Sequence, residues 1–124
     1  MDNQFVHPKM LVLRIALTAM LVLGIVVLGM WGVHWYQVSD PYMQEVLSLK
    51  GDVVQGNAIF QINCAGCHGS TANGKVGPSL VEVSKRKSKV SLIYQVISGK
   101  TPPMPKFQPN PQEMADLLQY LEEL

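Results

Sequence analysis

The apolar residues of the chain are concentrated in one N-terminal run. From Ile15 to Val33 the sequence reads IALTAMLVLGIVVLGMWGV, with no charged side chain and no polar helical face. At 1.5 Å per residue, a helix of this length would extend roughly 28 Å, close to the hydrocarbon core of a bilayer. Trp31, Trp35 and Tyr36 stand at its end, and such amphipathic rings favour the headgroup level of a membrane. The pattern therefore predicts a transmembrane helix.

Two other interpretations of this run are a buried core helix and a cleaved signal peptide. A core helix would show a polar face, and none is present. A signal peptide would have a shorter apolar region followed by a small-residue cleavage site. The segment from Trp31 to Tyr36 offers no such site, so we expect the anchor to be retained.

Charged residues flank the run asymmetrically. Lys9 and Arg14 lie before the run, whereas Asp40 and Glu45 lie beyond it. The positive-inside rule therefore places the N-terminus in the cytoplasm and the rest of the chain across the membrane. The expected parts are a cytoplasmic tail at 1–9, a transmembrane anchor at 10–36, a tether at 37–50 and a globular domain at 51–124.

Beyond the anchor the apolar spacing is helical and never convincingly alternates. It predicts helices over 52–63, 88–98 and 110–124, with Gly99 at the end of the second. A shorter helix is expected after Asp40, because a proline follows that suits the first helical position. The fold class predicted is all-α. The side chains expected on the apolar faces are Val53, Ile59, Phe60, Ile62, Val90, Ile93, Tyr94, Ile97, Met114, Leu117, Leu118 and Leu121.

Two long segments rich in glycine or proline, 69–78 and 100–109, separate these helices and predict loops. About 75 residues that include two such loops make a thin hydrophobic core. We therefore expect a bound group to complete the interior of the domain.

The segment INCAGCHGS contains both cysteines, Cys64 and Cys67, and His68 follows directly. C-x-x-C-H is the attachment motif of c-type haem. Cysteines three positions apart lie on one side of a helical turn, so both thiols can form thioethers with the vinyl groups of one porphyrin. The adjacent imidazole can then ligate the iron. The motif predicts one covalently bound haem c.

The motif has two rival interpretations. A thioredoxin-like C-x-x-C pair belongs in a βαβ setting, and this segment lies among predicted helices. A structural zinc site needs four ligands. The chain has only two cysteines, and its other histidines, His7 and His34, flank the anchor.

The second axial position of the iron also has a candidate. In TPPMPKF, Met104 stands between Pro103 and Pro105, which stiffen the loop that would present its thioether. The alternative is a methionine that only packs in the core. Pro78, ten residues after His68, offers a carbonyl that could accept the second ring N–H of the ligating imidazole, although a simple Gly-Pro turn explains it nearly as well.

These elements together resemble the class I cytochromes c. The residues that carry the resemblance are Gly56, Phe60, Cys64 to His68, Gly77-Pro78, Met104-Pro105 and the segment Ala115 to Leu121. The resemblance implies that Met104 is the distal ligand and that Pro78 hydrogen-bonds the proximal histidine. It also implies that the first and last helices of the domain cross through Gly56, Phe60, Leu117 and Tyr120.

The anchor and the stretch SLIYQVISGKTPPMPKFQP are similar, more closely, to the membrane-anchored cytochrome cM group of cyanobacteria. This similarity implies a thylakoid or plasma membrane, with the haem domain on the lumenal or periplasmic side. That side agrees with the orientation argued from charge.

An iron closed on both faces predicts an electron carrier and not an enzyme. The expected partners are the membrane and protein redox donors and acceptors such as a cytochrome complex, a photosystem or a terminal oxidase. The net charge of +1 gives no indication of nucleic-acid binding. The alternatives are a haem gas sensor and a structural subunit of a larger membrane electron-transfer complex.

Lysines near the expected haem edge are candidates for steering a partner. They are Lys75, Lys100 and Lys106, with the run KRKSK at 85–89 as a second option that is more simply a solvated helix start.

Overall fold

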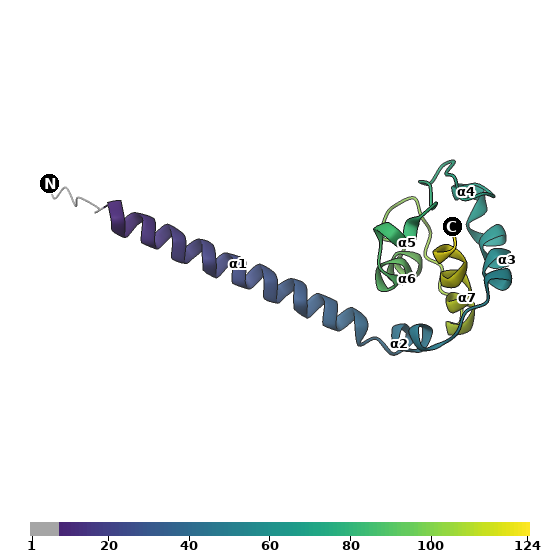
Figure 1. The fold of residues 1–124 in the computed structure, drawn as a ribbon, viewed down its shortest axis with the longest axis horizontal. Coiled ribbons are helices and arrows are strands. Elements are labelled where there is room, and N and C mark those ends of the chain that lie inside the picture. The colour runs from purple at the N-terminus through teal and green to yellow at the C-terminus, as the bar shows by residue number, and fades with distance from the viewer. Residues whose placement is uncertain (1–7) are drawn as a thin grey trace. The chain divides into compact units, whose positions relative to one another are not determined.

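The computed structural model describes residues 8–124, and these residues form helices and loops without a strand. The predicted all-α class is therefore confirmed. The chain divides into two compact units between Tyr36 and Gln37, and each is described separately. The helices are α1 (Pro8–Val38), α2 (Pro41–Ser48), α3 (Val53–Asn63), α4 (Ala65–His68), α5 (Val83–Arg86), α6 (Lys89–Ser98) and α7 (Pro111–Glu122) (Figure 1).

Helix α1 contains the whole segment predicted as an anchor. Its 31 residues correspond to about 46 Å of helix, and none of its side chains is buried. Its length and composition suffice to cross a membrane. Near its end Trp31 packs edge-on against Trp35, with ring centroids 6.0 Å apart. Of the predicted tail at 1–9, only Pro8 and Lys9 lie within the described residues, and they begin this helix.

Helices α3 and α7 pack directly against each other (Figure 1). Gly56 permits this approach, because a Cβ atom there would overlap the main-chain carbonyl of Asp116. One turn further, the rings of Phe60 and Tyr120 lie 5.2 Å apart. The buried carboxylate of Asp116 also accepts the main-chain N–H of Asp52 at 2.8 Å, which joins the start of α3 to α7.

Helix α2 lies within the segment 37–50 that is predicted to be a tether. It begins after Asp40, whose carboxylate accepts the N–H of Tyr42. Met43 and Val46 are each only 1% exposed, and α2 packs on α6 and α7. The hydroxyl of Tyr42 donates to the carbonyl of Pro109 at 2.9 Å. This segment therefore contributes side chains to the core of the globular unit.

The other helices begin and end near the predicted residues, and their caps explain why. Asp52, Ser88 and Asn110 each accept a main-chain N–H at the start of α3, α6 and α7. Gly99 ends α6 in the left-handed conformation, with φ of 55°. The two single-turn helices α4 and α5 were not predicted, because one turn carries too little apolar periodicity to be recognised.

The apolar faces agree with the prediction only in part. In α7 the four expected residues are all buried, whereas in α3 only Phe60 is, and Ile62 is 82% exposed. In α6 the buried residues are Leu92, Ile93 and Val96. The other expected α6 side chains, Val90, Tyr94 and Ile97, pack on the core but stay half-exposed.

Candidate functional site

The C-x-x-C-H residues lie on one helical turn. Helix α3 ends at Asn63, and Cys64 serves as its C-cap and as the N-cap of α4. The carbonyl of Cys64 accepts the N–H groups of Cys67, at 3.1 Å, and of His68, at 2.9 Å. Both thiols are free, Cys64 half-buried and Cys67 exposed. The turn thus places two unpaired thiols and an imidazole within five consecutive residues.

The pKa of the Cys64 thiol differs from that of the attacking cysteine in a redox-active dithiol. Burial, and secondarily the neighbouring Cys67, raise the pKa of the Cys64 thiol to about 11. Thioredoxin-like pairs depend on a cysteine whose pKa is lowered, so that a thiolate attacks the disulfide. The pKa of Cys64 shifts in the opposite direction, so Cys64 is not suited to be the attacking thiolate of such a pair.

The ring of His68 is held by the loop that follows it. Its Nδ1 lies 2.8 Å from the carbonyl oxygen of Pro78, so Nδ1 carries the proton and donates. Gly77 lies against the ring, since a Cβ there would fall 2.7 Å from Cε1 of His68. This bond leaves Nε2 as the nitrogen with a free lone pair. A ring fixed through Nδ1 is how metal-ligating histidines are oriented.

Backbone hydrogen bonds close the 69–78 loop onto the motif. The carbonyl of Cys67 accepts the N–H groups of Val76 and Gly77, at 2.9 and 2.7 Å. The carbonyl of His68 accepts the N–H of Gly74 at 2.7 Å. Gly74 has φ of 94°, a conformation that glycine adopts readily. The position of Pro78 relative to His68 is therefore built by the loop backbone.

Met104 lies in the loop after α6 and is half-buried. Its N–H donates to the carbonyl of Thr101 at 3.0 Å. Further along, the N–H of Phe107 donates to the carbonyl of Val96 at 3.0 Å, which fastens the loop to α6. The sulfur accepts a hydrogen bond from Nε2 of Gln95 at 3.4 Å. Sequence reasoning missed Gln95, although its position four residues before Gly99 places it on the last turn of α6.

The chemistry of these residues fits haem. Several apolar side chains from three segments pack on the core yet remain partly exposed, and an apolar group could cover them. They are Leu80, Val90, Tyr94, Ile97, Met104 and Phe107. The donor set also fits, because an imidazole nitrogen and a thioether are established axial ligands of haem iron.

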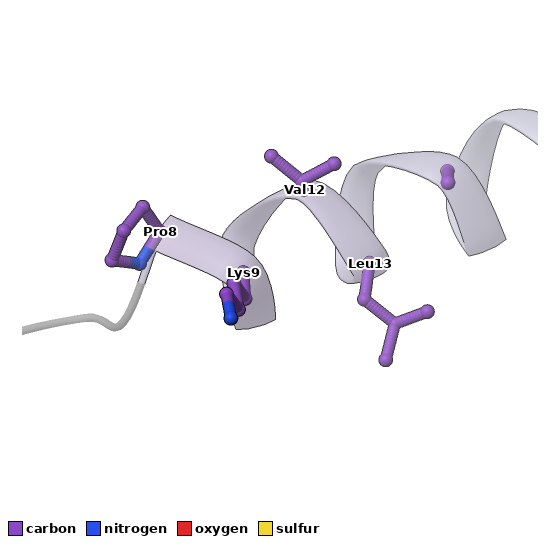
Figure 2. Close-up of a pocket in the computed structure, with 5 residues that line it drawn as sticks. Pro8, Lys9, Val12 and Leu13 are labelled. Atoms are coloured by element: carbon purple, nitrogen blue, oxygen red, sulfur yellow. The ribbon is translucent and has the colours of Figure 1, made fainter.

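Other places in the described chain offer no comparable chemistry. Among residues 8–124, no three His, Cys, Asp or Glu side chains gather where a metal ion could be held. A shallow hollow on α1 is lined by Pro8, Lys9, Val12, Leu13 and Ala16 (Figure 2). One face of a single helix forms it, and Lys9 is its only charged group.

Comparison with known proteins assigns the globular unit to a family. Residues 51–121 match the family model described as cytochrome c oxidase, cbb3-type, subunit III. A protein described as cytochrome c-553-like, from Synechocystis sp. (strain ATCC 27184 / PCC 6803 / Kazusa), is 64% identical over 85 residues. The aligned region is 68% of this chain and 81% of that relative. The chain belongs to the class I c-type cytochromes.

Membership in the class I c-type cytochromes implies that the chain binds haem and carries electrons. The resemblance inferred from the motifs is thereby confirmed. The family match begins at residue 51, so it includes the C-x-x-C-H turn, Pro78 and Met104 but neither α1 nor α2.

Proposed function

We propose that this cytochrome is a membrane-anchored, mono-haem carrier that passes single electrons between membrane redox proteins. The observation that carries the proposal is the geometry of the His68 side chain. His68 lies on the same turn as the two free thiols, and its Nδ1 donates a hydrogen bond to the carbonyl oxygen of Pro78. This bond leaves Nε2 as the nitrogen that can ligate a metal.

Each site residue has a distinct role in this proposal. Cys64 and Cys67 would hold the haem through two thioethers, and His68 and Met104 would ligate its iron. Pro78 orients the imidazole and makes it a stronger donor through the Nδ1 hydrogen bond. The bound haem supplies one-electron chemistry between Fe(III) and Fe(II), and methionine ligation raises its reduction potential.

With His68 and Met104 both bound to it, the iron would have no position left for a substrate. This favours outer-sphere electron transfer over catalysis or gas binding. The loop that presents Met104 is fastened to α6 through Phe107 and Val96, and prolines flank the methionine. Both features disfavour release of the thioether.

A partner is proposed to dock where lysines surround the loops of the site. Lys75 lies in the loop closed onto Cys67, and Lys100 and Lys106 flank Met104; all three are exposed. None of them forms an ion pair within residues 8–124. Their charge is therefore available to steer an acidic partner.

The run at 85–89 is already engaged in local interactions. Lys85 pairs with Glu82, and Lys89 pairs with Glu122 across to α7. Arg86 donates to the carbonyls of Ser79 and Val81. These contacts favour a structural role for the run over partner docking.

The anchor is proposed to be α1, crossing a thylakoid or plasma membrane once. Support comes from its length, its exposed apolar side chains and the Trp31–Trp35 pair at its end. Lys9 and Arg14 at its N-terminal end favour a cytoplasmic N-terminus and a haem domain in the lumen or periplasm.

The testing experiment is an optical spectrum of the ferrous full-length protein in detergent, with and without carbon monoxide. An unchanged low-spin spectrum supports closure by His68 and Met104. A matched Met104→Ala variant should bind the gas, because its sixth position is open. Gas binding by the unaltered protein would refute the carrier proposal and favour the sensor.

A second candidate function has one specific observation in its favour. The family model that matches is described as a subunit of an oxidase. If this cytochrome were a structural subunit, gentle solubilisation of its native membrane would yield it in fixed stoichiometry with a larger complex. Recovery as a free single chain supports the carrier.

A further inference from the structure

We propose that Tyr42 is a positioning residue for Met104: its hydroxyl holds the loop that presents the thioether, and so keeps other ligands off the haem iron. The inference rests on the proposed function, because it requires Met104 to ligate the iron. The hydroxyl of Tyr42 donates to the carbonyl oxygen of Pro109 at 2.9 Å, across 67 positions of the chain. Tyr42 lies on α2, outside the residues that match the family, so the family match does not include the donor of this bond.

The carbonyl of Pro109 is the point at which α2 holds the end of the loop. Residues 99–110 join α6 to α7, and Met104 lies near their middle. Pro109 is buried and has no N–H, so its carbonyl is the one main-chain group through which it can be held. Among residues 8–124, the Tyr42 hydroxyl is the one donor to that carbonyl. Removal of this donor would leave a buried carbonyl without a partner, which costs free energy.

Two other contacts fix the chain on either side of this point. The N–H of Phe107 donates to the carbonyl of Val96 at 3.0 Å, which attaches the loop to α6. Asn110 forms a capping box at the start of α7. The segment that follows Met104 is therefore held from two helices, by Phe107 on α6 and by Tyr42 on α2. Loss of the Tyr42 bond leaves one attachment before α7, and outward movement of the segment should become easier.

The donor is itself fixed, and it stays protonated. Helix α2 packs through Met43 and Val46, each 1% exposed, and the carboxylate of Asp40 accepts the N–H of Tyr42 at 2.8 Å. Burial, and secondarily Glu113, raise the pKa of Tyr42 to about 12. The phenol therefore keeps its proton, and can donate, well above neutral pH.

The expected effect is on the balance between a closed site, with Met104 on the iron, and an open one. A thioether is a soft ligand that favours Fe(II), so it leaves most readily in the ferric protein. Added imidazole binds only the open form, and its apparent affinity is proportional to the fraction of protein that is open. Loss of a hydrogen bond that exists only in the closed form should raise that fraction about twofold to tenfold.

The test is an imidazole titration of the ferric full-length holo-protein in detergent, followed by haem absorption. Tyr42→Phe keeps the ring and removes only the donor. The imidazole concentration at half-saturation should fall about twofold to tenfold relative to the unaltered protein. Tyr120→Phe is the matched control, because it removes a hydroxyl from a ring that packs on Phe60, away from the loop. It should leave that concentration unchanged.

A Met104→Ala background shows whether Tyr42 acts through the methionine. This background has no closed form, so Tyr42→Phe should leave its imidazole affinity unchanged. An equal effect of Tyr42→Phe in both backgrounds would mean that the hydroxyl acts on the haem site as a whole, and it would overturn the proposal. A lower urea midpoint of Tyr42→Phe with unchanged imidazole affinity would also overturn it, because the bond would then only stabilise the packing of α2.

The Met104→Ala variant also separates failure of this inference from failure of the ligand assignment. It should bind imidazole more tightly than the unaltered protein does. If the two bind it equally, Met104 is not a ligand, and the role of Tyr42 falls with that assignment. If they differ while Tyr42→Phe matches the unaltered protein, the role of Tyr42 alone is overturned.

Discussion

Truncation of Met43 to alanine should destabilise the haem domain substantially. Met43 lies on α2, outside the segment that matches the family, yet it is only 1% exposed and packs in the core. A buried methionine changed to alanine typically costs about 2–5 kcal/mol, from lost burial and the cavity that remains. We expect about 3 kcal/mol here, because Met43 lies on a short helix whose next residues, Gln44 and Glu45, are exposed, so the site can partly collapse.

Urea unfolding of the holo-domain, residues 37–124, followed by far-ultraviolet circular dichroism, would measure this loss. With a slope of about 1–2 kcal/mol/M for a small domain, about 3 kcal/mol lowers the midpoint by about 1.5–3 M. Leu47→Ala is the matched control, since Leu47 lies on the same helix but is 38% exposed. It should cost less than about 1 kcal/mol.

Equal and small effects of the two substitutions would refute the reasoning. Such a result would mean that α2 does not pack on α6 and α7 in solution and that residues 37–50 act as a tether. A domain that starts at residue 51 should then be as stable as one that starts at residue 37. If α2 belongs to the core, the shorter domain should lose the contributions of Met43, Val46 and the Tyr42–Pro109 hydrogen bond together.

Three other predictions follow from contacts in the same unit. Gly77→Ala should cost about 1–3 kcal/mol in urea unfolding, because its Cβ would press on the His68 ring, whereas Gly66→Ala, with nothing within 4 Å, should be nearly neutral. Gly56→Ala should be at least as damaging, because the overlap is with the main chain of α7, and an unchanged midpoint would mean that α3 and α7 are not in close contact. Burial, and secondarily a nearby carboxylate, raise the pKa of Tyr42 from 10.0 to about 12, so folding favours the neutral phenol. This contribution to the free energy of unfolding is complete below pH 10 and is lost as the pH rises toward 12. The difference in the free energy of unfolding between the unaltered protein and Tyr42→Phe should therefore shrink from pH 10 to pH 12. A difference that stays constant over this range would contradict the prediction.

Local signals in the sequence explain most of the fold. Three helices begin at capping residues that are recognisable by type, and α6 ends at a glycine in the conformation that glycine favours. The placement of α2 could not be predicted in the same way. Asp40 and the proline that follows it indicate that a helix begins there. No local pattern indicates that Met43 is buried, because its burial depends on contacts with α6 and α7. Ile62 shows the converse, an apolar residue at a helical position that faces away from the core.

In the candidate site, too, some residues are positioned by contacts close in the sequence and others by contacts with distant elements. Cys64, Cys67 and His68 share one turn, so their chemistry can be read from spacing alone. Pro78 lies ten residues after His68, in a loop that backbone hydrogen bonds close onto Cys67 and His68. Because this separation is short, the hydrogen bond between His68 and Pro78 could be predicted from the sequence.

The methionine side of the site depends on contacts between different elements. The prolines around Met104 predict a stiff loop, but they do not say where the loop lies or how the sulfur is oriented. Those properties come from the bond between Phe107 and Val96, and from the amide of Gln95 on the last turn of α6. The proposed axial ligands thus differ in what holds them: His68 is oriented by its own loop, and Met104 by a neighbouring helix. Substitutions in α6 should therefore affect the methionine side of the haem first and leave the His68–Pro78 hydrogen bond intact.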